Sequence, residues 1–176
     1  MLADEINRTP PKTQAALLEA MQEKTVTVRG KNHVLDKPFI VLATQNPIEL
    51  EGTYPLPEAE LDRFLMKIFI DYPSHQDEVT MARQLTTGLI DDQITEQSSA
   101  IVDPAAMQAL QHTAATIDID AQVVDYAVRL VRASRESTAI QRGAGPRASL
   151  ALLRAARSKA LLRGAHFVLP DDVKAM

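Results

Sequence analysis

The chain has 176 residues and a formal net charge of −4, 45% of its residues are hydrophobic, and it contains no cysteine. This composition allows a sizeable core in one domain or two small ones, excludes disulfides and thiolate metal sites, and argues against a nucleic-acid binder that relies on bulk positive charge. No apolar run is long enough to span a bilayer and no stretch resembles a signal peptide, so we expect a cytoplasmic protein with no membrane partner.

The first predicted element is a short apolar strand that ends at two adjacent carboxylates, Asp4 and Glu5. In an open α/β sheet, ligands bind outside the carboxyl ends of the strands. The pair would place a metal-binding carboxylate beside a candidate base at that edge, and the alternative is a strand that ends in two solvated acids. Thr9 is predicted to cap the next helix, because two prolines follow it. Apolar positions at helical spacing extend that helix over residues 12–23.

A hairpin and a buried strand are predicted next. Residues 25–28 alternate between polar and apolar side chains and residues 33–35 return after a turn, which indicates a hairpin. The run Phe39–Thr44 does not alternate, and its continuous apolar character is typical of a parallel strand buried on both faces. It gives way at Asn46 to polar residues and a turn.

A second helix and a further apolar strand complete the α/β pattern. Pro57 can start a short helix over residues 58–63, whose first turn carries acids that the helix dipole favours. Residues 66–70 are predicted to form another buried strand, and residues 48–56 a loop rich in Glu, Gly and Pro. This order of strands and helices indicates an α/β fold.

Beyond residue 73 the pattern becomes helical. Helices are predicted over residues 75–85, 104–115, 121–135 and 146–163, and a further helix begins at residue 170. Residues 88–103 are expected to form a linker with one short strand. We therefore predict an α/β domain over residues 1–73 and an all-α domain over residues 74–176.

Three further polar residues are candidates for a site. Asn46 stands at the end of a predicted buried strand, although an amide there is also typical of a simple turn. Arg63 follows two acids, and a weak local ion pair is the alternative role for it. Arg147 lies in the first turn of a helix that starts at Pro146 without a capping side chain, where the helix dipole disfavours a cation. Free backbone N–H groups beside an arginine make an anion site.

Basic residues also crowd the stretch from residue 132 to residue 163, where Glu136 is the only acid. They are Arg132, Arg135, Arg142, Arg147, Arg154, Arg157, Lys159 and Arg163. Such a face suits a nucleotide phosphate, a nucleic acid or an acidic partner, and the alternative is a solvated helix surface. The four histidines are scattered without the spacing of metal ligands.

Four motifs in this order resemble the MoxR family of AAA+ ATPases. They are the stretches Leu2–Gln14, Ala43–Pro47, Leu56–Phe64 and Gly143–Ser149. Each motif is modestly specific, but four in register are highly specific. The resemblance implies part of a P-loop NTPase (AAA+) parallel α/β sheet over residues 1–73, followed by an all-α helical lid over residues 74–176.

The resemblance also implies a role for each polar candidate in the hydrolysis of ATP with Mg²⁺. Asp4 and Glu5 match the Walker B pair, so Asp4 would help to hold Mg²⁺ through water and Glu5 would deprotonate the attacking water. Asn46 matches sensor 1, which helps to place that water. Arg63 matches the arginine finger, which acts on the nucleotide of a neighbouring subunit, and Arg147 matches sensor 2. The set is chemically coherent, because phosphoryl transfer requires positioning and charge neutralisation.

The resemblance further implies a homo-oligomeric ring, a hexamer, that hydrolyses ATP to drive chaperone-like remodelling of client proteins. Members of the family often work beside proteins with von Willebrand factor A domains. The hairpin over residues 25–35 matches the pre-sensor-1 hairpin of the family. One departure is the absence of a phosphate-binding G-x-x-x-x-G-K-[ST] loop. Because the chain opens on the Walker B strand, we expect a fragment of a longer ATPase that is inactive alone.

Two other functions remain open at this point. The chain could be a non-catalytic interaction module that has lost nucleotide binding with its phosphate loop. It could also belong to a ring ATPase that remodels nucleic acid, since related rings use a similar hairpin on DNA, although the net charge of −4 argues against that role.

Overall fold

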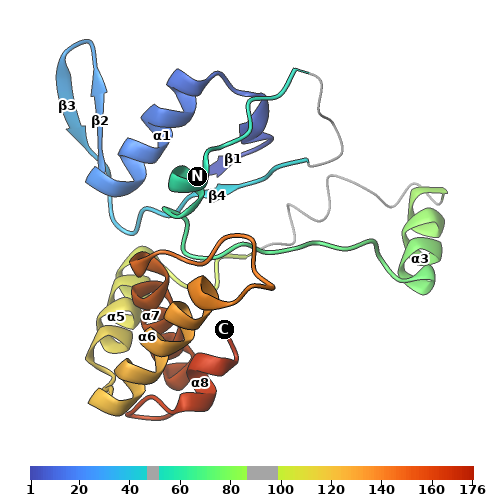
Figure 1. Cartoon of the computed structure of the whole chain (residues 1–176). Coiled ribbons are helices and arrows are strands. Elements are labelled where there is room, and N and C mark those ends of the chain that lie inside the picture. Colours follow the sequence, from blue (N-terminus) through green and yellow to red (C-terminus); the bar gives the residue numbers. More distant parts are fainter. Residues whose placement is uncertain (47–51, 87–98) are drawn as a thin grey trace. The chain divides into compact units, whose positions relative to one another are not determined.

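A computed structural model describes residues 1–46, 52–86 and 99–176, and the chain forms two compact units. Unit 1 comprises Met1–Met66 and Pro104–Met176, and unit 2 comprises Lys67–Asp103. Unit 1 contains an α/β segment, residues 1–66, and a helical segment, residues 104–176 (Figure 1). The domain boundary near Pro73 stays a prediction.

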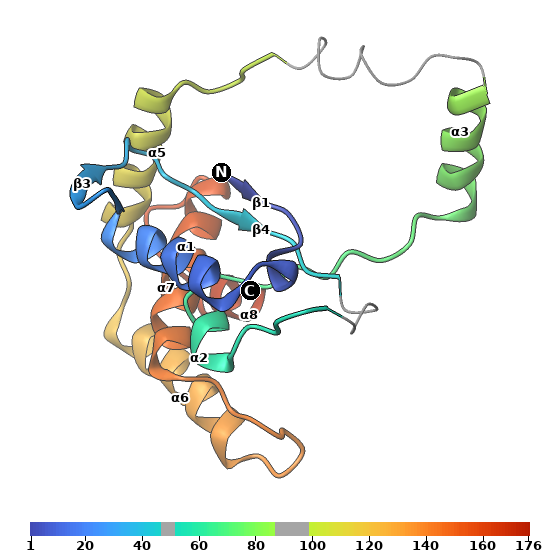
Figure 2. The same ribbon diagram turned by 90° about the horizontal axis from the view of Figure 1, so that it is seen from above.

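The sheet of the α/β segment is small. Strand β1, Leu2–Ala3, pairs in parallel with strand β4, Leu42–Ala43, and Figure 2 shows the two strands side by side. The strand before Asp4 is thus confirmed. The prediction of a strand buried on both faces over Phe39–Thr44 was wrong in its length and burial, since Leu42 is 64% exposed. Burial on both faces needs covering layers, and β4 pairs only with β1 among the residues that the structure describes.

Helix α1, Pro11–Glu23, packs beside this sheet and supplies most of the local core. Ile6, Leu18 and Leu56 are buried together, and the partly buried residues around them are Leu17, Met21, Ala43, Leu61 and Phe64. The prediction that Thr9 caps this helix was wrong, because Pro10 occupies the N-cap position. The Thr9 hydroxyl instead donates to the Ile6 carbonyl at 2.7 Å, in the 3-10 turn Ile6–Arg8.

The predicted hairpin is confirmed. Strands β2, Thr25–Val28, and β3, Lys31–Val34, pair in antiparallel fashion after α1 (Figure 1). The two turn residues, Arg29 and Gly30, have φ angles of 50° and 77°. Positive φ at both central residues is the requirement of a tight type I′ hairpin turn, which explains why β3 begins earlier than the sequence pattern indicated.

Helix α2, Glu58–Leu61, begins after Pro57 as predicted, but the strand predicted after it is not present. Residues 66–70 form no strand in the structure, and Ile70 is 92% exposed. The buried strand predicted there was therefore wrong, because an apolar run becomes a strand only beside a second strand. Unit 2 contains helix α3, His75–Thr86. Most of the predicted linker over residues 88–103 lies outside the described residues.

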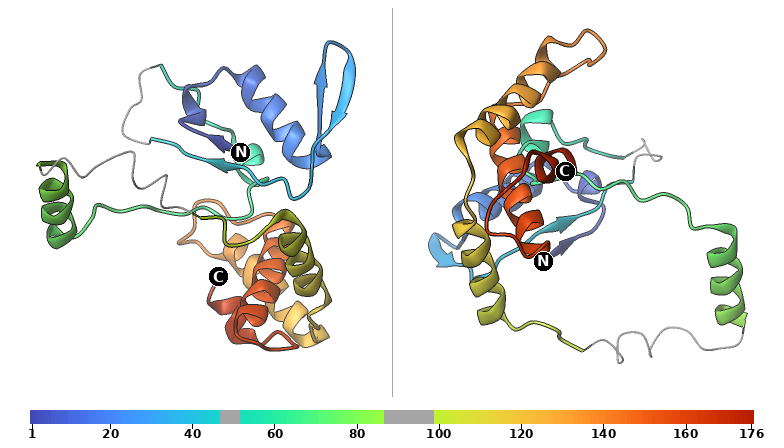
Figure 3. Two further views of the ribbon diagram at one scale, coloured as in Figure 1. Left: turned by 180° about the vertical axis from the view of Figure 1, so that it is seen from behind. Right: turned by 90° about the horizontal axis from the view of Figure 1, so that it is seen from below.

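The helical segment contains α5, Pro104–Thr116, α6, Ala121–Glu136, α7, Pro146–Leu162, and α8, Pro170–Lys174. Each agrees with a predicted helix to within about two residues, which is the usual uncertainty of a helix end. Helix α7 contacts α5, α6 and α8 and runs through this group in both views of Figure 3.

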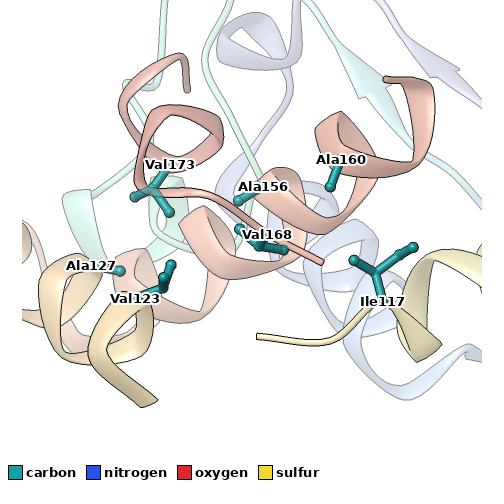
Figure 4. Packing of buried hydrophobic residues seen from close by; sticks show 7 residues of the cluster. All are labelled: Ile117, Val123, Ala127, Ala156, Ala160, Val168 and Val173. Carbon is teal, nitrogen blue, oxygen red and sulfur yellow. The ribbon is translucent and has the colours of Figure 1, made fainter. Parts of the chain in front are cut away.

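One apolar cluster holds these helices together (Figure 4). Its members are Ile117, Val123, Ala127, Ala156, Ala160, Val168 and Val173. The three alanines are fully buried, and such small side chains let the helix backbones approach closely. Among the described residues, no helix is both long enough and apolar enough to cross a membrane.

A buried ion pair fixes the start of α8. The guanidinium of Arg163 donates to both carboxylate oxygens of Asp172, at 2.7 and 3.2 Å, and the Leu169 amide donates to the same carboxylate at 2.8 Å. The Asp172 side chain is only 5% exposed. The hydrogen bonds from Arg163, more than the bond from Leu169, keep the pKa of Asp172 below its ordinary value although burial opposes them.

Candidate functional site

The two predicted acids form a tight turn at the carboxyl end of β1. Asp4 is exposed, and Glu5 has a left-handed backbone with φ 47° and ψ 50°. That conformation is uncommon for a residue other than glycine. Backbone bonds hold it, since the Arg8 amide donates to the Glu5 carbonyl at 2.8 Å and the Ile6 amide donates to the Thr44 carbonyl at 3.0 Å.

The Thr44 side chain, next to β4, contacts both acids. Its hydroxyl donates to Oδ1 of Asp4 at 2.5 Å and accepts from the Glu5 amide at 2.8 Å. The carboxylate of Glu5 also pairs with Arg8, with 2.9 Å between Oε2 and Nε. The side chains of Glu5 and Arg8 are 39% and 48% exposed, so this pair stabilises the fold by about 0–1 kcal/mol.

Asn46 lies at the same edge, beyond the end of β4. Its carbonyl accepts from Nδ2 of Asn7 at 3.2 Å, and Asn7 is buried directly after the turn of Glu5. The structure thus brings Asp4, Glu5 and Asn46 to the carboxyl ends of two paired parallel strands. Adjacent parallel strands end at a common edge of a sheet, where ligands bind in open α/β folds.

A buried glutamine supports this edge from α1. Nε2 of Gln14 donates to the carbonyls of Ile6, at 3.1 Å, and Tyr54, at 2.8 Å. The Tyr54 amide in turn donates to the Asn7 carbonyl at 2.6 Å. These bonds join three stretches of chain: the turn after β1, helix α1 and the stretch before α2.

Sequence reasoning missed the contributions of Thr44, Asn7 and Gln14. Two signals could have pointed to Thr44 and Gln14, although neither signal gives the hydrogen-bond partners. Thr44 and Asn46 are two residues apart at a strand end, a spacing that places side chains on one face. Gln14 lies four residues before Leu18 on the apolar stripe of α1, and a polar residue on such a stripe needs buried hydrogen-bond partners.

The two predicted arginines lie on other elements. Arg63 is exposed just after α2, and Arg147 is exposed as the second residue of α7. Within the described ranges, neither makes an ion pair with Asp4 or Glu5, and Arg63 does not form the local ion pair considered for it. As predicted, α7 begins at Pro146 with no capping side chain and no acid in its first turn.

The loop before Arg147 packs closely against the end of α6 (Figure 3). The Ala144 amide donates to Oγ of Ser134 at 2.9 Å, and Nε of Arg135 donates to the Ala144 carbonyl at 2.7 Å. A Cβ added at Gly143 would lie 2.4 Å from the Cα of Arg135. Glycine at this position is therefore required by the close approach of two backbones.

The basic stretch from residue 132 to residue 163 is not one free anion-binding face. Half of its eight cations have protein partners: Arg132 pairs with Glu136, Arg135 with the Ala144 carbonyl, Arg142 with Glu58 and Arg163 with Asp172. These contacts neutralise or occupy part of the charge. Arg147 and Arg154 remain exposed.

The edge formed by Asp4, Glu5 and Asn46 fits a magnesium nucleotide. Mg²⁺ usually keeps several waters and binds one or two carboxylates together with substrate phosphates. Asp4 offers an exposed carboxylate whose Oδ1 is held by Thr44. Among the described residues, no group of three His, Asp or Glu side chains could hold a metal ion by itself.

Family comparisons agree with this geometry. Residues 1–66 match the family described as "ATPase family associated with various cellular activities (AAA)", and residues 132–176 match the AAA lid domain. A crystal structure of a protein from Cytophaga hutchinsonii that is assigned as an ATPase superposes with a TM-score of 0.87 at 40% identity, over 99% of this chain and 54% of that one. The predicted fold class, an AAA+ α/β sheet followed by a helical lid, is thus confirmed.

Curated relatives narrow the family further. Chaperone MoxR1 of Mycobacterium tuberculosis is 44% identical over 98% of this chain and 47% of its own length, and YeaC of Bacillus subtilis is 44% identical over 99% and 53%. Protein MoxR of Methylorubrum extorquens is 33% identical over 98% and 54%. The chain spans about half the length of the curated relatives it matches. From these matches, the chain belongs to the MoxR family of AAA+ ATPases.

Proposed function

We propose that the protein containing this chain hydrolyses ATP with Mg²⁺ and uses that reaction to remodel client proteins. The observation that carries the proposal is the meeting of Asp4, Glu5 and Asn46 at the carboxyl ends of β1 and β4. A carboxylate for the metal, a second carboxylate as base and a polar amide are the groups that nucleotide hydrolysis requires at one place.

Each residue has a proposed role at this edge. Asp4, the Walker B aspartate, helps to hold Mg²⁺ through water, and the metal when bound neutralises charge on the phosphates. Glu5 orients and deprotonates the attacking water. Asn46, as sensor 1, holds that water near the terminal phosphate. The exposed ion pair between Glu5 and Arg8 does not conflict with this role, because a bond of about 0–1 kcal/mol is readily exchanged for a water.

The two exposed arginines act on the phosphates in this proposal. Arg63 is the arginine finger and reaches the nucleotide of a neighbouring subunit, which makes a ring, proposed to be a hexamer, part of the mechanism. Such a residue is typically worth roughly 10³–10⁵ in rate. Arg147 is sensor 2, at the uncapped start of α7, where free amides and a cation suit an anion.

The phosphate-binding loop has no counterpart in these 176 residues. We propose that this chain alone does not hydrolyse ATP and that the loop is supplied by the part of the protein that matches the remaining half of the relatives. The clients are proposed to be proteins in the cytoplasm, where ATP is supplied, with von Willebrand factor A domain proteins as partners by family resemblance.

The test is Glu5→Gln in the intact protein that joins this chain to a phosphate-binding loop. Loss of a general base typically costs about 10²–10⁴ in rate, so ATP turnover should fall by at least about 100-fold while ATP binding persists. Glu19→Gln is the matched control, because Glu19 is an exposed acid on α1. Unchanged turnover in Glu5→Gln would refute the assigned base. Absence of turnover in the unmodified protein would favour the non-catalytic interaction module.

A further inference from the structure

We propose that Thr44 is a positioning residue of the hydrolytic site, which fixes Asp4 and Glu5 relative to β4 through its hydroxyl. The inference rests on the proposed function, since it assigns to Thr44 the support of the metal carboxylate and the base. It adds a residue that lies outside the five candidates found from the sequence.

The Thr44 hydroxyl uses its donor position and one acceptor position on the two acidic residues. A threonine hydroxyl has one donor and two acceptor positions. Here the donor bonds Oδ1 of Asp4 at 2.5 Å, and an acceptor position takes the Glu5 amide at 2.8 Å. One side chain therefore contacts both acids, and it does so from the neighbouring strand, 39 and 40 residues away in sequence.

The backbone of Thr44 also bonds to the residues on either side of the turn. The Thr44 amide donates to the Ala3 carbonyl at 3.0 Å, and the Thr44 carbonyl accepts from the Ile6 amide at 3.0 Å. The backbone of Thr44 is thus hydrogen-bonded to the residue before and the residue after the turn that Asp4 and Glu5 form. The Glu5 amide lies between these two bonds, and the Thr44 hydroxyl is its partner.

The Thr44 hydroxyl also supports the left-handed conformation of Glu5. A left-handed backbone at a residue such as Glu5 is sparsely populated and persists where surrounding contacts determine it. Removal of the hydroxyl would release the Glu5 amide and the Asp4 carboxylate in one step. Both proposed groups would then lose their fixed orientation, although β1 and β4 would remain paired through their backbones.

The size of the effect expected from the loss of the Thr44 hydroxyl can be estimated from other proteins, in which similar groups orient metal-binding carboxylates. Loss of such an outer partner typically costs about 10–100-fold in metal affinity or activity. Thr44→Val keeps the size and β-branching of the side chain, and Thr44 is exposed, so core packing is unaffected. Thr44→Ser keeps the hydroxyl and loses only the methyl group.

The experiment measures kcat, the KM for ATP and the Mg²⁺ concentration for half-maximal turnover in the intact ring-forming protein. We expect Thr44→Val to lower kcat about 10–100-fold and to raise the Mg²⁺ requirement, with a smaller change in KM. Thr44→Ser should restore most of the activity. Thr27→Val is the matched control, because the Thr27 hydroxyl donates to Asn32 in the hairpin and contacts neither acid.

The outcomes separate this inference from the proposed function. Normal kinetics in Thr44→Val, with turnover abolished in Glu5→Gln, would overturn the role of Thr44 and leave the proposed function standing. Equal losses in Thr44→Val and Thr44→Ser would also overturn it, because the methyl group would then matter rather than the hydroxyl. Full activity in Glu5→Gln would overturn the proposed function itself. If Thr44→Val lost its thermal unfolding transition, Thr44→Ala, which also lacks the hydroxyl, would be measured against Thr44→Ser.

Discussion

The α/β segment and the helical segment differ in the number of apolar residues that each one buries within itself. The helical segment buries seven apolar residues in one cluster, all between residues 117 and 173. The corresponding cluster of the α/β segment, around Leu18, has three buried members, and the parallel sheet consists of two strands of two residues each. Several of its large apolar side chains, such as Leu2, Ile40 and Leu42, are at least half exposed.

The difference follows from where each kind of element finds its hydrogen bonds. A helix satisfies its interior backbone groups within its own segment, whereas every strand needs a neighbouring strand. Consecutive helices can therefore build a core from their own segment, whereas a strand depends on a partner elsewhere in the chain. The site at the ends of β1 and β4 lies in the segment with the smaller core.

The largest expected effect is obtained by separating the two segments. A chain of residues 104–176 should retain helical circular dichroism and a cooperative thermal transition, because it includes the entire cluster around Ala156. A chain of residues 1–66 should show no such transition, because few apolar residues become buried in it. Circular dichroism recorded during heating measures the helical signal and the thermal transition of each chain. The absence of a cooperative transition in residues 104–176, or its presence in residues 1–66, would contradict the comparison.

A smaller loss of stability is expected from a substitution in the loop between α6 and α7. Gly143→Ala places a Cβ 2.4 Å from the Arg135 Cα and 2.6 Å from its amide nitrogen, so one backbone must move. Such overpacking typically costs about 1–3 kcal/mol, and urea denaturation of the whole chain would measure the loss.

The matched control is Gly145→Ala in the same loop. Its φ is −73°, and an added Cβ would meet only the Asp62 carboxylate, at the ordinary contact distance of 3.5 Å. The free energy of unfolding should change by less than about 1 kcal/mol. Equal losses in the two variants would show that the tight contact at Gly143 is not the cause.

The smallest effect is a pH dependence at the start of α8. Because the pKa of Asp172 is lowered in the folded chain, first by hydrogen bonds from Arg163, its charge stabilises the fold above the ordinary carboxyl pKa. That contribution is lost as pH falls through the lowered value. The pKa of Arg163 is raised from an already high value, so Arg163 stays charged throughout.

Asp172→Asn should therefore be less stable than the unmodified chain near neutral pH, and the difference should shrink as the pH falls below about 4. Urea denaturation across this range measures it. Asp171→Asn is the control, because Asp171 is the exposed acid next to it in α8. A difference that stays constant with pH would contradict the assigned ion pair.

The sequence predicted the helices well for a physical reason. Apolar spacing, Pro146 and Pro170 lie within the helices that they define, so their signals are local. The strand at residues 66–70 was predicted from its apolar run alone, but strand formation depends on a partner that the run does not contain. Thr9 was assigned as a cap by its residue type, whereas Pro10 takes that position and leaves the hydroxyl of Thr9 to the Ile6 carbonyl.

The candidate site was predictable in part. The order of the motifs indicated Asp4, Glu5 and Asn46, and the pairing of β1 with β4 brings these three to one edge. The roles of all five residues, Arg63 and Arg147 included, stay predictions. Contacts of Thr44 with Asp4 and Glu5 could not be inferred from spacing, because they depend on a strand register and on a left-handed residue, neither of which leaves a simple pattern in the sequence.

The left-handed turn at Glu5 has a consequence for adjacent like charges. In an extended strand, neighbouring side chains point to opposite faces of the sheet, so Glu5 would lie across the sheet from Asp4. The turn removes Glu5 from that alternation and gives each acid its own partner, Thr44 for Asp4 and Arg8 for Glu5. The negative charge of each side chain is thereby offset by a nearby partner, while the Thr44 hydroxyl, which also accepts from the Glu5 amide, links the two residues.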